Sequence, residues 1–145
     1  MQNIPSVELG GLVIRKVMEN LPLDEKEIDG VIMGLCLPGV GLSPARQAVL
    51  AAKFPVETNA FTVDRACCSA LSAVGIGIQW ILGEQASIMI AGGMENMSRT
   101  PYLIPQMRWG ARCRPSHRIG NVGRYASRPL RSGFIIILWA TFHVL

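Results

Sequence analysis

Cys67 is the residue whose type and position best fit covalent chemistry. It follows an apolar segment, residues 59–63, that predicts a strand, and it opens a segment of small and apolar residues, 67–82, that predicts a buried helix. The start of a helix offers free backbone N–H groups and partial positive charge, and both stabilise a thiolate. A thiolate is the nucleophile of thioester chemistry, so the placement has a chemical rationale. Buried cysteines are common and usually inert, so the position of Cys67 alone does not show that it is a nucleophile.

The other residues that could take part in catalysis are less well placed than Cys67. Cys68 points about 100° away from its neighbour around the predicted helix and is interpreted as a small packing residue. Ser69 has no base in view and is interpreted as a helix cap. Arg65 is close enough in sequence to add positive charge. His117 and His143 are the two histidines of the chain and the candidates for a general base, but both lie outside the regular pattern of the first part.

Other kinds of site do not match the spacing. The four cysteines form no Cys-x-x-Cys pair and lie far from the histidines, so no metal site is expected. Adjacent cysteines at 67–68 do not suit a disulfide framework, which favours a cytoplasmic location. Residues 39–41 lack the third glycine and the Gly-Lys-Ser/Thr ending of a phosphate loop. We expect no signal peptide, because the N-terminus has no basic region followed by an apolar run, and no membrane helix, because no apolar run reaches roughly 18–20 residues.

The elements that would position Cys67 alternate between helix and strand. Helices are predicted over 7–21, 44–53 and 67–82, and strands over 31–35, 59–63 and 86–91. Ser6 and Ser43 are the expected caps of the first two helices, and Gly92-Gly93 is expected to close the third strand. Continuous apolar strands between helices are typical of a parallel sheet covered by helices. The predicted fold class is therefore α/β.

Charge divides the chain into two parts. Residues 1–95 hold all 10 acidic residues and 6 basic ones, whereas residues 96–145 hold 8 arginines and no acidic residue. The formal net charge of +4 therefore reflects a distinct C-terminal segment and not a uniformly basic protein, so no nucleic-acid partner is expected. From about residue 114 the helix–strand pattern stops, and nothing in the pattern supplies a partner for the apolar run FIIILWATFHVL.

Two motifs resemble those of the thiolases. VDRACCSALSAV at 63–74 is similar to the family's nucleophile segment, Asn-x-x-Cys-x-Ser-Gly-Leu. AGGMENMSRTPYL at 91–103 is similar to Ala-Gly-Gly-x-Glu-x-Met-Ser with a nearby Pro-Tyr. The resemblance covers about residues 5–113, which we interpret as a partial N-terminal thiolase domain. The chain departs from the pattern at Asp64, where Asn is usual, at Cys68 and at Ala70, whose methyl group would crowd the helix start.

The resemblance implies an incomplete N-terminal βαβαβ half of a thiolase-like fold, in which Cys67 is the catalytic nucleophile. It implies ping-pong acyl transfer from a 3-ketoacyl-CoA to coenzyme A, or the reverse Claisen condensation, through an acyl group on Cys67, with coenzyme A thioesters as substrates and no further cofactor. Full-length relatives are homo-oligomers. The stretch Gly92–Glu95 is expected to be a structural turn beside the site, without a bond-making role. Ketoacyl synthases also place a cysteine after Asp-x-Ala, but they lack AGGMENMS at this distance, so the thiolase interpretation is favoured.

The family's base and second cysteine lie in Gly-His-Pro and Cys-x-Gly segments, and neither segment occurs in this sequence. The family's first strand is not apparent either. We therefore expect the chain itself to be inactive, and the alternative function is that of a non-catalytic remnant or interaction fragment. Residues 114–145 form a basic and apolar tail that does not continue the family pattern, and translation in a shifted frame is our hypothesis for its origin.

Overall fold

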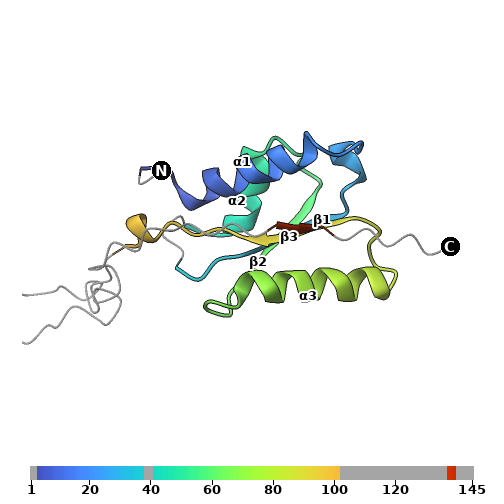
Figure 1. Cartoon of the computed structure of the whole chain (residues 1–145). Coiled ribbons are helices and arrows are strands. Elements are labelled where there is room, and N and C mark those ends of the chain that lie inside the picture. The colour runs from blue at the N-terminus through green and yellow to red at the C-terminus, as the bar shows by residue number, and fades with distance from the viewer. Residues whose placement is uncertain (1–2, 38–40, 102–136, 140–145) are drawn as a thin grey trace, which may run out of the picture.

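Three parallel strands form the centre of the domain and end level with one another (Figure 1). They are β1 (Gly30–Gly34), β2 (Asn59–Val63) and β3 (Met89–Gly93), in the spatial order β2-β1-β3. At the carboxyl end, Gly34 pairs with both Val63 and Gly93. Because the strands are parallel and in this register, the segments that follow them meet at one edge of the sheet.

The computed structural model describes residues 3–37, 41–101 and 137–139. In the last of these ranges, β4 (Ile137–Trp139) pairs antiparallel with β3. The sequence pattern supplied no partner for the apolar C-terminal run, and for these three residues the partner is β3. A short apolar run shows no partner in its own sequence, because the partner is chosen by tertiary contact. The expected change of character between residues 114 and 136 lies outside the described residues.

Helices cover both faces of the sheet (Figure 1). The helices α1 (Ser6–Met18) and α2 (Pro44–Ala51) lie on one face, and α3 (Ser69–Leu82) lies on the other. Two short 3₁₀ segments, η1 (Glu25–Glu27) and η2 (Met97–Arg99), complete the elements of the described ranges. This layering confirms the predicted α/β class with a parallel sheet between helices. In the described part of the chain, no helix has the length and apolar character that crossing a membrane requires.

The strands bury side chains on both faces, which explains their continuous apolar sequences. Val31 and Met33 of β1 belong to the core cluster under α1 and α2, whereas Ile32 belongs to the cluster under α3. On the α3 side, the rings of Phe61 and Trp80 lie 5.5 Å apart between their centroids. The alternation of side chains along a strand thus divides one apolar run between two cores.

A glycine allows α1 and α2 to pack closely. A Cβ atom added at Gly11 would lie 2.8 Å from the Ala51 Cβ and 2.9 Å from the Ala48 carbonyl oxygen. The buried Ile14, one turn further along α1, then reaches the same core as Val49 of α2. The small residues of both helices therefore set the distance between them.

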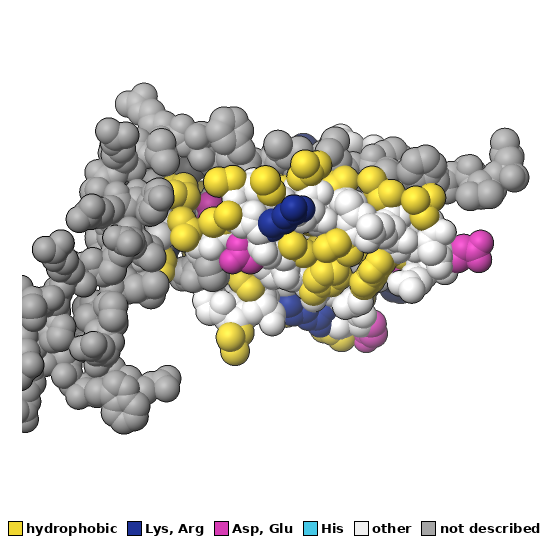
Figure 2. Space-filling model, turned by 90° about the horizontal axis from the view of Figure 1, so that it is seen from below, with side chains coloured by type: hydrophobic (Ala, Val, Ile, Leu, Met, Phe, Trp, Pro, Cys, Tyr) yellow, Lys and Arg dark blue, Asp and Glu magenta, His cyan; other side chains and the backbone are white. Residues whose placement is uncertain are grey.

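The helix after β2 differs from its prediction in start and burial. It begins at Ser69, not at residue 67, and only Ser69, Ala73 and Gly77 are buried. Leu71 is 70% exposed and Leu82 is 71% exposed. Figure 2 views the molecule from this side, where apolar side chains gather on the surface. The helix covers a sheet with one stripe only, and an apolar sequence on all sides does not reveal which stripe is covered.

The third strand includes the two glycines that were expected to close it. A Cβ atom at Gly93 would lie 2.7 Å from the Ala70 methyl group, so the glycine makes room for the start of α3. Because Gly93 has no side chain, the methyl group of Ala70 fits at the contact between β3 and α3, and the predicted crowding at the helix start is avoided. The interpretation of Gly92–Glu95 as a turn is wrong for both glycines, which are paired with β1.

Of the two predicted helix caps, Ser6 is wrong and Ser43 is confirmed in its position but not in its hydrogen bond. Pro5 occupies the N-cap position of α1, and Ser6 is its first helical residue. Ser43 does occupy the N-cap position of α2, but its side chain makes no capping hydrogen bond and its φ is 49°. The predicted strand at 59–63 matches β2 residue for residue, and the one at 31–35 is displaced by one residue.

Candidate functional site

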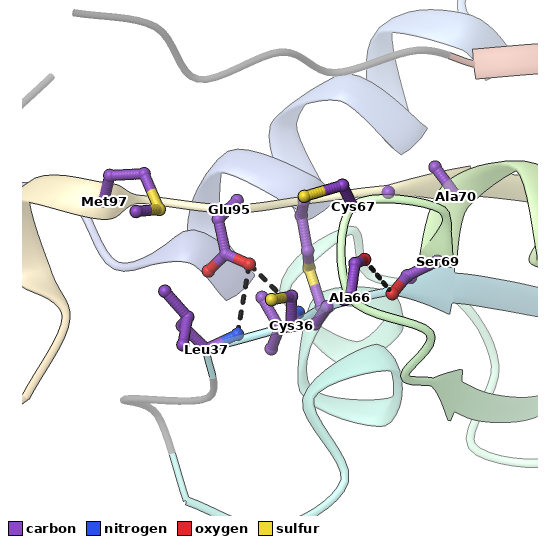
Figure 3. Close-up of a pocket in the computed structure, with 12 residues that line it drawn as sticks. Cys36, Leu37, Ala66, Cys67, Ser69, Ala70, Glu95 and Met97 are labelled. Atoms are coloured by element: carbon purple, nitrogen blue, oxygen red, sulfur yellow. Dashed lines mark hydrogen bonds between the residues drawn. The ribbon is translucent and has the colours of Figure 1, made fainter. Parts of the chain in front are cut away.

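A cavity of about 550 Å³ lies where the three parallel strands end (Figure 3). Its walls come from three chain segments: the residues after β1, the turn between β2 and α3, and the residues after β3. Cys67 lines the cavity and is exposed to solvent. Nearly all of the lining is apolar, and Glu95 is the charged residue among the lining side chains. The site is thus an apolar hollow with an accessible thiol.

A tight turn presents Cys67. Its preceding residue, Ala66, has a φ of 49°, a left-handed conformation that a residue with a Cβ seldom adopts. The Asp64 carboxylate accepts a hydrogen bond from the Ala66 N–H at 3.0 Å. The Ser69 hydroxyl accepts from the Arg65 N–H at 2.8 Å and donates to the Ala66 carbonyl at 2.6 Å. These bonds hold the backbone in its unusual conformation.

The structure changes the predicted relation between Cys67 and the helix. Cys67 precedes the first helical residue by two positions, and Cys68 occupies the N-cap. The N–H groups of Cys68 and Ser69 donate to the carbonyls of Arg65 and Ala66, each at 3.1 Å. Two of the donors expected to face the thiol are therefore engaged within the turn.

The neighbours of Cys67 also differ from their predicted roles. Cys68 is exposed, so its interpretation as a packing residue is wrong. Ser69 is 4% exposed and makes no capping bond, because its hydroxyl bridges the turn instead. The Arg65 guanidinium lies 3.5 Å from the Ser72 hydroxyl, on the α3 side of the turn. The Arg65 side chain therefore points toward α3.

Two further residues of the site were not singled out by sequence reasoning. Glu95 accepts hydrogen bonds from the backbone N–H groups of Cys36 at 3.0 Å and Leu37 at 3.2 Å (Figure 3). Cys36 itself lines the cavity. Burial raises the pKa of the Cys36 thiol, and the negative charges of Glu95 and Asp64 add to this effect. Each residue lies two positions beyond the end of an observed strand, Cys36 after β1 and Glu95 after β3, and both come soon after the end of a predicted strand.

The structure does not describe the two candidate histidines. His117 and His143 lie outside the described residues. Residues 3–37, 41–101 and 137–139 contain no histidine, so no imidazole lies beside Cys67 within these ranges. Among the same residues, no group of three or more His, Cys, Asp or Glu side chains is arranged to hold a metal ion.

An α/β domain that presents a cysteine at the carboxyl edge of a parallel sheet is suited to chemistry through a thiol nucleophile. Residues 1–124 match the family model described as thiolase, N-terminal domain. The chain therefore belongs to the thiolase family. This membership confirms the resemblance found in the two sequence motifs.

Known relatives support the same membership. The chain is 43% identical over 113 residues to the acetyl-CoA acetyltransferase of Pseudomonas aeruginosa, covering 77% of this chain and 29% of that protein. It is 38% identical over 131 residues to the acetyl-CoA acetyltransferase of Escherichia coli, covering 90% of this chain and 32% of that protein. The crystal structure of the Bacillus anthracis acetyl-CoA acetyltransferase superposes with a TM-score of 0.78 and 30% identity. That match covers 90% of this chain and 33% of the crystallised chain, so this chain spans about a third of these relatives.

Proposed function

We propose that this domain carries an acyl group on Cys67 as part of a thiolase-type acyltransferase. The observation that carries the proposal is the exposed Cys67 thiol at an apolar cavity, held on a turn with a left-handed residue before it. A carbonyl carbon entering the cavity would meet the sulfur without displacing a packed side chain. The family membership supplies the reaction class, since relatives bear the name acetyl-CoA acetyltransferase.

The proposed reaction begins with attack of the Cys67 thiolate on the thioester carbonyl of an acyl-CoA. A carbon–sulfur bond forms, the coenzyme A thiolate leaves, and the acyl group remains on Cys67. With a 3-ketoacyl-CoA, the thiolate instead attacks the 3-keto carbon, the bond between carbons 2 and 3 breaks, and an acyl-CoA leaves once its carbon 2 has taken up a proton. A second coenzyme A then removes the acyl group, which gives ping-pong kinetics. The substrates are coenzyme A thioesters, and the proposal needs no other cofactor.

The chain alone is proposed to turn over slowly or not at all. Among the described residues no imidazole is available to take the proton of Cys67. Loss of a general base typically costs about 10²–10⁴-fold in rate. This observation favours a second candidate function, that of a non-catalytic fragment that binds a partner without turnover. We also propose homo-oligomeric assembly and a cytoplasmic location, the latter because adjacent Cys67 and Cys68 do not suit a disulfide framework.

The test is an acylation assay on the purified chain. Incubation with acetyl-CoA, followed by peptide mass spectrometry, should place one acetyl group on Cys67 and release one coenzyme A. The variant Cys67→Ala should lose the label, and the matched control Cys68→Ser should keep it, because Cys68 does not line the cavity. Acylation without turnover supports the acyl-carrier proposal. Labelling of Cys68 or Cys36 in place of Cys67, or no labelling of a folded chain, would contradict it and favour the non-catalytic candidate.

A further inference from the structure

Two of the described cysteines share one cavity. Cys36 comes from the segment after β1 and Cys67 from the turn after β2, and both are free thiols (Figure 3). The two segments touch just behind them, because a Cβ atom at Gly34 would lie 2.8 Å from the Ser69 Cβ. Cys36 is two residues beyond Gly34, and Cys67 is two residues before Ser69. The two thiols therefore lie on adjoining walls of the cavity.

The environments of the two thiols differ. Cys67 is exposed, so an oxidant dissolved in water reaches it directly. Cys36 is partly buried, and burial followed by the negative charge of Glu95 raises the pKa of its thiol. A negative charge on Cys67 also raises the pKa of Cys36, as expected for neighbouring groups. Cys67 is consequently the thiol that reacts first, and Cys36 is the protonated thiol held beside it.

We propose that Cys36 is the resolving thiol for an oxidised Cys67. The Cys67 thiolate attacks hydrogen peroxide, an S–O bond forms as the O–O bond breaks, and the hydroxide that leaves is protonated to water. The Cys36 sulfur then attacks the Cys67 sulfur, an S–S bond forms as the S–O bond breaks, and the Cys36 proton passes to the departing hydroxide, which leaves as a second water. The two sulfurs together lose two electrons, which reduce the peroxide. The inference uses only the thiols and does not rest on the acyl-transfer proposal.

Geometry favours Cys36 over Cys68 as the resolving thiol. Cys68 does not line the cavity, whereas Cys36 does. A disulfide between adjacent residues closes a small ring that strains the peptide bond between them. A link from Cys67 to Cys36 instead joins two segments that already meet, and it requires their Cα atoms to come within about 4.4–6.8 Å. The link would also remove the nucleophile reversibly and protect it from further oxidation.

The experiment treats the full 145-residue chain, shown to be folded by circular dichroism, with hydrogen peroxide and no coenzyme A. Non-reducing peptide mapping should recover a Cys36–Cys67 cross-link and the loss of two free thiols per chain. In Cys36→Ser the cross-link should disappear, and Cys67 sulfenic acid trapped by dimedone should increase severalfold. The matched control Cys68→Ser should form the cross-link as the parent does. If Cys36→Ser does not fold, the presence or absence of the Cys36–Cys67 cross-link in the peptide map of the parent chain tests the inference.

Three results would overturn the inference: a link from Cys67 to Cys68, a link from Cys67 to Cys113, or Cys67 sulfinic acid with Cys36 still reduced. The outcome is separable from the acylation assay. A chain that accepts an acetyl group but forms no Cys36–Cys67 link overturns this inference only. A chain that forms the link but accepts no acetyl group overturns the proposed function only.

Discussion

The Glu95 carboxylate lies 3.0 Å from the Cys36 backbone nitrogen and joins two segments that are 59 residues apart in sequence. The same oxygen also accepts from the Leu37 N–H at 3.2 Å. These two hydrogen bonds connect Glu95, which follows β3, with Cys36 and Leu37, which follow β1, at the wall of the cavity. Glu95 therefore shapes the site through the backbone, whatever chemistry Cys67 performs.

Replacement of Glu95 by alanine should destabilise the domain. Two charge-assisted hydrogen bonds are lost, and two backbone N–H groups of the cavity wall lose their acceptor. The expected decrease in the free energy of unfolding is about 1–3 kcal/mol, measured by urea denaturation. Glu95→Gln retains an acceptor oxygen and should recover part of the loss. Equal stability of Glu95→Ala and the parent would show that the two bonds are dispensable.

Gly93→Ala should destabilise the contact between β3 and α3. The added methyl group would lie 2.7 Å from the Ala70 Cβ, which forces a shift of the helix start. Overpacking of this kind typically costs about 1–3 kcal/mol. In the double variant Gly93→Ala with Ala70→Gly, the clash is absent, so the two changes should compensate in part. Strict additivity of the two single effects would contradict the packing explanation.

Ser69→Ala should loosen the turn that carries Cys67. The variant leaves the Arg65 N–H and the Ala66 carbonyl without their hydroxyl partner at a buried position. We expect a loss of about 1–3 kcal/mol in stability and an altered rate of Cys67 alkylation by iodoacetamide. The matched control is Ser72→Ala, whose hydroxyl makes only a 3.5 Å contact with Arg65 and which should change stability by about 0.5 kcal/mol or less. Similar effects of both variants would count against a special role for Ser69.

The alkylation of Cys36 should depend on pH in a shifted range. Burial, then the charges of Glu95 and Asp64, raise the pKa of the Cys36 thiol, so its thiolate forms only above the pH range of an ordinary thiol. Its alkylation rate should therefore be low at neutral pH and should continue to rise on the alkaline side. Removing a nearby negative charge favours the thiolate, so Glu95→Gln should move the profile to lower pH. Rates can be followed by mass spectrometry of the Cys36 peptide, and an unmoved profile would rule out the contribution of Glu95.

Local sequence features were enough to predict the order of the elements and the position of the nucleophile candidate. Each strand is a short apolar run, and each helix follows a local period, so β2 at 59–63 was predicted with its correct ends. The segment around Cys67 was recognisable because its residue types and its distance to AGGMENMS are properties of the chain alone. No knowledge of distant contacts was needed for these conclusions.

How these elements form a site depends on contacts that arise when the domain folds. Gly93 is a packing residue because Ala70 approaches it from another element, and Glu95 binds the backbone of Cys36 because three strands end in register. The exposed stripe of α3 was likewise set by which side faces the sheet. Each of these outcomes depends on contacts between residues far apart along the chain. Local propensity and periodicity carry no record of such contacts, and for that reason the cavity and its second thiol became apparent only in the folded domain.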